Sequence, residues 1–161
     1  MNDKQLNPFW RDRMKKTLGS ILLAGVLFLA GCGQKALSAK DVAKVIKGEP
    51  TNVSVIYTDD AGSIQRTDIV EDKDLVAEVA GALDKYSTKV VKDKVTFKQK
   101  DTVIGVEAKD STGTYNATLY SNGYMKVQKI GEDVVVYQIT EDELNSLSTL
   151  WSDYMKAHSE E

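Results

Sequence analysis

Apolar positions follow two spacings along this chain, one typical of helices and one typical of strands. Three segments place apolar residues every three to four positions, which predicts amphipathic helices over residues 38–47, 72–86 and 140–156. Seven shorter segments predict strands. The first alternates apolar and polar residues, the second follows it after a turn, and the last five form a β-rich stretch. These strands cover residues 53–57, 63–70, 89–97, 103–108, 115–120, 124–130 and 134–139.

Polar residues mark where the predicted helices begin. Ser38 and Asp41 have the spacing of a capping box, in which each side chain accepts a hydrogen bond from the backbone N–H of the other residue. The same spacing recurs in Thr140 and Glu143. Asp72 can cap the middle helix, because an aspartate oxygen accepts from the free amides of a first turn.

Short polar turns separate the later strands, at residues 109–113, 121–123 and 131–133. Asn122-Gly123 is the strongest turn signal, since both residues tolerate the positive φ of a two-residue hairpin turn. Strands joined so closely must be antiparallel. We therefore predict an α+β fold, with one twisted, mainly antiparallel sheet and helices packed on one face, in the order α-β-β-α-β-β-β-β-β-α. The layout resembles small cystatin-like, TBP-like and β-lactamase-inhibitor-like folds.

A long uncharged run lies near the start of the chain. Residues 17–31 carry no charged side chain over 15 positions and follow a basic stretch, Arg11 to Lys16. As a helix this run would extend about 22 Å, which is less than the roughly 30 Å of bilayer hydrocarbon. A basic flank, a short apolar run and small residues at its end are typical of an export signal. Met14 offers an alternative start to Met1.

The run ends in Leu29-Ala30-Gly31-Cys32, which holds the only cysteine of the chain. This block resembles a bacterial lipobox. The resemblance implies cleavage before Cys32, a diacylglyceryl group on its thiol and a mature protein anchored at the extracytoplasmic face of the cell membrane. We accordingly expect a signal peptide at 1–31, a lipidated N-terminus and short linker at 32–37, one domain at 38–156 and a frayed tail at 157–161.

The charge of the expected mature chain limits its partners. From residue 32 onward there are 16 basic and 22 acidic residues, a net charge of −6. Nucleic acid is therefore excluded as a partner, because phosphate binding draws on clustered Lys and Arg. With Cys32 lipidated no thiol remains for a disulfide, so we expect a monomer held together by its core, with no cofactor and no metal.

Catalytic patterns are absent from the sequence. The only histidine, His158, lies in the expected tail, and no serine lies in a Gly-x-Ser-x-Gly or Ser-x-x-Lys pattern. The acidic residues gather at helix starts and at the Asp59-Asp60 turn, where carboxylates cap free amides. A basic run is the exception on an acidic chain; it is either a solvated face or a contact for an acidic partner or lipid headgroups. It comprises Lys89, Lys92, Lys94, Lys98 and Lys100.

Aromatic residues provide the candidate interaction surface. Tyr115, Tyr120 and Tyr124 gather around one predicted hairpin, and tyrosine is enriched at interaction hot spots. The alternative is that they are ordinary cross-strand packing pairs. Trp151 lies centrally on the apolar face of the last helix and is expected in the core.

Residues 119–124 and 134–137, followed by a capped helix, resemble small lipoproteins of Gram-positive bacteria. That resemblance carries no catalytic residues. The leading function is a membrane-anchored, non-enzymatic binding or interaction module with a protein partner at the cell surface. The alternatives are an inhibitor-like or accessory subunit of a membrane or cell-wall enzyme and, third, a small wall-active hydrolase.

Overall fold

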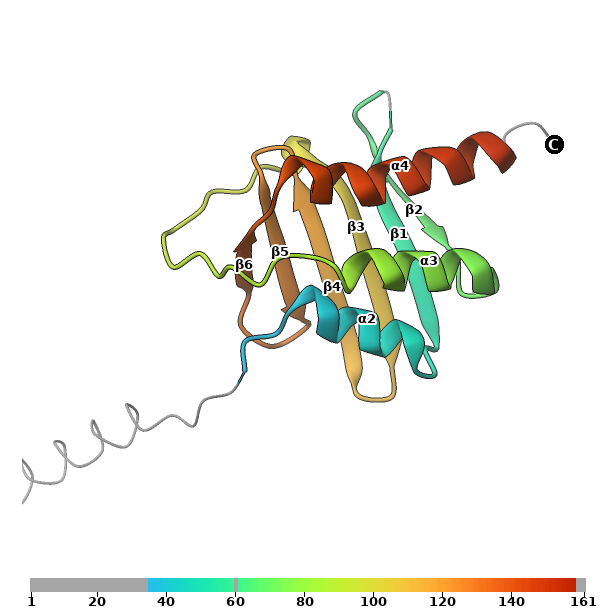
Figure 1. Cartoon of the computed structure of the whole chain (residues 1–161), viewed down its shortest axis with the longest axis horizontal. Coiled ribbons are helices and arrows are strands. Elements are labelled where there is room, and N and C mark those ends of the chain that lie inside the picture. The colour runs from blue at the N-terminus through green and yellow to red at the C-terminus, as the bar shows by residue number, and fades with distance from the viewer. Residues whose placement is uncertain (1–34, 60, 159–161) are drawn as a thin grey trace, which may run out of the picture. The chain divides into compact units, whose positions relative to one another are not determined.

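The computed structural model describes residues 35–59 and 61–158. Its elements form one six-stranded antiparallel sheet with helices on one face, which confirms the predicted fold class (Figure 1). The helices are α2 (Ala39–Lys47), α3 (Lys73–Leu83), the 3₁₀ helix η1 (Gln99–Asp101) and α4 (Glu141–His158). The strands are β1 (Asn52–Thr58), β2 (Ile64–Asp68), β3 (Thr102–Asp110), β4 (Gly113–Tyr120), β5 (Tyr124–Lys129) and β6 (Val135–Gln138).

Two rows of side chains cross the helix-covered face of the sheet, whose strand order is β2-β1-β3-β4-β5-β6. Both rows follow directly from the strand register, since cross-strand partners project from the same face. One row consists of Val55, Val106, Ala117, Val127 and Val135. The second row runs from Tyr57 on β1 to Tyr137 on β6, through Ile104, Leu119 and Met125.

The helices close the core over these rows. Their inward faces bury Val42 and Ile46 of α2, Val79 and Leu83 of α3, and Leu147 of α4, each at 2% exposure or less. Their starts have the predicted caps. Asp41 Oδ2 accepts from the backbone N of Ser38 at 2.9 Å. Glu143 Oε2 accepts from the backbone N of Thr140 at 2.7 Å, and Asp72 Oδ1 accepts from that of Leu75 at 3.0 Å.

One predicted strand is missing. Residues 89–97 form no strand but meet β6 through a single bridge, Val90 to Tyr137. The next strand, β3, lies in the middle of the sheet, between β1 and β4, so the chain must leave the β6 edge to reach it. We call residues 87–101, which make this connection, the crossing segment.

Two smaller predictions also differ from the structure. The β4–β5 connection spans residues 121–123, because Tyr120 pairs with Tyr124, and only Gly123 has positive φ, at +82°. The turn is therefore a three-residue hairpin connection, in which a glycine takes the left-handed position after a tighter turn. In addition, α4 continues to His158, two residues beyond the predicted end of the domain.

Candidate functional site

A groove of about 530 Å³ lies along the C-terminal half of α4. In this region the helix crosses the ends of β1 and β3 (Figure 1). Apolar and aromatic side chains form much of its lining, and polar residues from the β1 end and α4 complete it. Such a combination is typical of binding sites. Its lining includes Tyr57, Asp59, Ile104, Trp151, Ser152 and Met155.

The register and the helix spacing bring these residues together. Tyr57 is the last helix-facing residue of β1 and pairs with Ile104 on β3. Trp151 follows the buried Leu147 by four positions and so projects from the same face of α4. Its ring lies 5.1 Å from that of Tyr57 and 5.3 Å from that of Tyr154, between centroids.

The Trp151 indole has an unsatisfied hydrogen-bond donor. The side chain is 5% exposed, and its Nε1 is buried without an acceptor among the described residues. A buried donor without a partner costs free energy, and most native donors of this kind find one. An acceptor supplied by a bound molecule would remove that cost.

Two of the polar groups beside the groove, those of Ser148 and Asp59, are bound to the protein itself. Ser148 Oγ donates to the carbonyls of Leu144 and Asn145, at 3.0 and 3.2 Å. Hydrogen bonds from Gln65 and from turn amides lower the pKa of the Asp59 carboxyl, which therefore holds its turn as a carboxylate. The arrangement can hold an apolar group.

A second cluster of polar side chains lies on the sheet face opposite the helices. Ser54 is fully buried, and its Oγ contacts Asp68 Oδ1 at 2.5 Å and Arg66 at 2.9 Å. Arg66 also binds Glu107 at 2.5 Å. These hydrogen bonds lower the pKa of Asp68 and raise that of Arg66, mainly through Ser54 and Glu107 respectively. The cluster joins β2, β1 and β3 and is internally satisfied.

The structure does not bring the three candidate tyrosines to one surface. Tyr120 and Tyr124 pair across the hairpin, on the face opposite the helices. Tyr120 is only 5% exposed, because Phe97 of the crossing segment lies on it with ring centroids 4.4 Å apart. Lys126 Nζ lies 6.0 Å from the Tyr120 ring.

Tyr115 projects from the other face of the sheet. It is in the helix-facing register with Ala108 and Lys129, and its hydroxyl lies 2.7 Å from Thr112 Oγ1. An exposed surface formed by Tyr115, Tyr120 and Tyr124 together is therefore not present. The lipidation candidate, Cys32, and the predicted signal peptide lie outside the described residues.

The groove was not identified from the sequence. Its central residue, Trp151, is correctly predicted as buried. The groove itself arises from the place where α4 crosses the ends of β1 and β3, and no local pattern encodes that crossing. Within residues 35–59 and 61–158, no three His, Cys, Asp or Glu side chains are placed to hold a metal ion. No helix in this part of the chain has both the length and the apolar character needed to cross a bilayer.

Comparisons with protein-family models, with curated proteins and with solved structures gave no match to this chain.

Proposed function

We propose that this protein is a lipid-anchored, non-enzymatic binding module at the outer face of the cell membrane. The Leu29-Ala30-Gly31-Cys32 block behind an uncharged run supports the anchor. The first hydrogen bond that ties the chain to the sheet involves Leu37, five residues after Cys32, so the domain begins close to the anchor. Two acyl chains suffice for stable membrane attachment.

The groove beneath α4 is the binding site in this proposal. The single observation that carries it is that Trp151, whose buried indole N–H has no acceptor among the described residues, lines a largely apolar groove. The matching partner is a protein segment that inserts one apolar side chain and presents a carbonyl or carboxylate oxygen. Such a segment would bury apolar surface and give the indole an acceptor.

Recovery of partners from detergent-solubilised membranes tests this proposal. Ser152 lines the groove with an exposed side chain, so Ser152→Arg should block the groove and reduce recovery of the partner at least tenfold. Asn145→Arg is the matched control, because Asn145 is exposed on the same helix and does not line the groove. Equal recovery with both variants would contradict a binding role for the groove.

The same experiment separates the two leading functions. A single dominant partner in the wild-type recovery, lost with Ser152→Arg, would favour an inhibitor-like or accessory subunit of one enzyme. Several partners lost together would favour a general interaction module.

A further inference from the structure

The first described residues are hydrogen-bonded to one edge of the sheet, the edge formed by β6. The Tyr137 hydroxyl donates to the backbone carbonyl of Leu37 at 2.8 Å, and Val90 of the crossing segment bridges Tyr137. Backbone bonds from Val91 N to Val136 O and from Gln138 N to Lys89 O extend this contact. The start of the domain and the start of the crossing segment therefore meet at β6, on the left in Figure 1.

The crossing segment is basic on an acidic protein. Five lysines and two aspartates lie between residues 89 and 101, whereas the expected mature chain has a net charge of −6. Lys92, Lys94, Lys98 and Lys100 form no ion pair with any described residue. By contrast, Lys44 and Lys47 of α2 are paired with Asp41 and Asp84.

Exposed apolar side chains gather at the same edge. Five large hydrophobic residues are exposed in the described part of the chain, and three of them lie beside β6. Ile130, at 58%, and Val134, at 43%, belong to the β5–β6 turn, and Val90 is 43% exposed. We call these three residues together with Lys89, Lys92 and Lys94 the β6 edge surface.

We infer that the β6 edge surface lies against the membrane and binds anionic phospholipid headgroups. This inference rests on the proposed lipid anchor at Cys32. Leu37 follows Cys32 by five positions, which span at most about 17 Å, so the edge that holds Leu37 must stay near the bilayer. Lysines attract anionic headgroups, and exposed apolar side chains beside them enter the interface.

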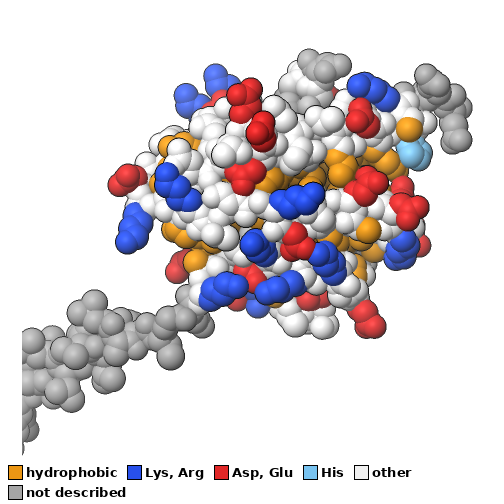
Figure 2. Space-filling view, in the orientation of Figure 1, with side chains coloured by type: hydrophobic (Ala, Val, Ile, Leu, Met, Phe, Trp, Pro, Cys, Tyr) orange, Lys and Arg blue, Asp and Glu red, His pale blue; other side chains and the backbone are white. Residues whose placement is uncertain are grey.

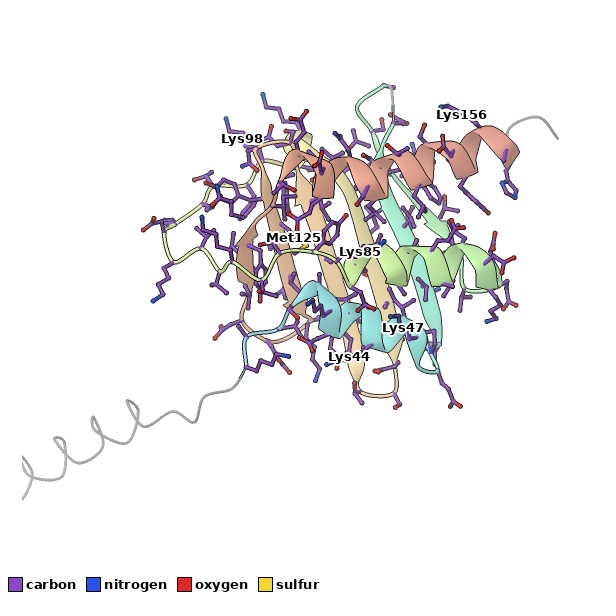
Figure 3. The ribbon with its side chains drawn as sticks, viewed as in Figure 1. Lys44, Lys47, Lys85, Lys98, Met125 and Lys156 are labelled. Atoms are coloured by element: carbon purple, nitrogen blue, oxygen red, sulfur yellow. The ribbon has the colours of Figure 1, made fainter. Side chains whose placement is uncertain are left out.

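Acidic groups at the edge do not cancel this charge. Glu132 of the turn forms an ion pair with Lys129, with its Oε1 3.1 Å from Lys129 Nζ. In sequence, Asp93 and Asp133 accompany the three lysines of the β6 edge surface, and Asp101 accompanies Lys98 and Lys100 further along the crossing segment. Five lysines therefore stand against three carboxylates. Figure 3 shows Lys98 at the left of the molecule and Lys156, at the far end of α4, at the right.

This orientation leaves the groove accessible. Tyr57 and Tyr137 lie at opposite ends of one cross-strand row, four strand spacings apart. At about 4.8 Å per strand this places the groove about 19 Å from the membrane-facing edge. A partner can then approach Trp151 without displacing lipid.

Lysine labelling on vesicles tests the inference. The lipidated protein, purified from membranes, is reconstituted into vesicles of phosphatidylcholine alone or with about one-third phosphatidylglycerol. A water-soluble acetylating reagent and peptide mass spectrometry then report the reactivity of each lysine. We expect Lys92 and Lys94 to react at least threefold more slowly on the anionic vesicles, and 0.5 M salt to restore their reactivity. Lys73, at the start of α3, is the control and should react equally on both.

The intact mass, measured on the same sample, separates this inference from the proposed function. Protein without a lipid on Cys32 would contradict the anchor itself. Lipidated protein with equal reactivity of Lys92 and Lys94 on both vesicles would overturn only the headgroup contact. A Lys92→Gln/Lys94→Gln variant should lose the protection of Lys89, whereas Lys73→Gln should retain it; protection that persists in the double variant would also overturn the inference.

Discussion

The Tyr137 hydroxyl donates to the carbonyl of Leu37, 100 positions away in the sequence. Burial raises the pKa of Tyr137, and its side chain is 2% exposed. This hydrogen bond fixes the chain just before α2 to the last strand of the sheet. It therefore determines which edge of the domain lies next to the proposed anchor.

Tyr137→Phe should lower the free energy of unfolding by about 1–2 kcal/mol, because it leaves the Leu37 carbonyl without its donor. Urea unfolding measures this loss, and amide exchange in α2 should become faster. Tyr124→Phe is the control, since Tyr124 is half-buried and lies away from α2. An equal loss with both variants would show that the Leu37 bond contributes nothing specific.

The two hairpin tyrosines should behave differently, because only one is covered. Tyr120→Ser should cost about 3 kcal/mol, since Tyr120 is 5% exposed and lies under Phe97. Tyr124→Ser should cost under about 1 kcal/mol. Thermal or urea unfolding of both variants measures the difference. A small loss with Tyr120→Ser would mean that the crossing segment does not cover the ring.

Trp151→Ala should be the most damaging single change in α4. Truncating a buried aromatic side chain costs roughly 3–5 kcal/mol, and Trp151 packs on both Tyr57 and Tyr154. Met155→Ala, at an exposed groove position four residues later, is the control and should cost under about 1 kcal/mol. Similar losses for both would contradict the packing described for α4.

Alkaline pH should destabilise the protein through Tyr86. Burial raises the pKa of Tyr86 to about 12, so the folded state resists ionisation of a phenol that ionises near pH 10 when unfolded. The contribution is fully present below pH 10 and is lost as the pH rises towards 12, by up to about 2 kcal/mol. Tyr86→Phe should flatten this part of the stability profile. An unchanged slope between pH 10 and 12 would contradict burial of the phenol.

The sequence predicts the layers of this fold because its local signals agree with one another. Caps at Ser38, Asp72 and Thr140 and the strand signals of six segments each depend on neighbouring residues, and all appear in the structure. The strand predicted over 89–97 fails for a non-local reason. Residues 89–97 must carry the chain from the β6 edge to β3, which lies in the middle of the sheet. The sequence within 89–97 holds no information about the place of β3.

The candidate sites likewise have a local part that the sequence predicts and a non-local part that it does not. Pairing of Tyr120 with Tyr124 follows from the turn, whereas the burial of Tyr120 depends on Phe97, 23 positions earlier. Likewise, Trp151 is recognisable as a core residue of its helix, but the groove needs Tyr57 from β1. Figure 2 shows apolar side chains at the surface between the helices.

Lipidation at Cys32 is the central claim, and metabolic labelling with a tagged fatty acid tests it most directly. Wild-type protein recovered from membranes should carry the label and begin at Cys32. Cys32→Ala should carry no label and keep residues 1–31, since the thiol that would receive the lipid is gone. Equal labelling of the two proteins, or an unlabelled wild type, would contradict the anchor and with it the membrane-facing role of the β6 edge surface.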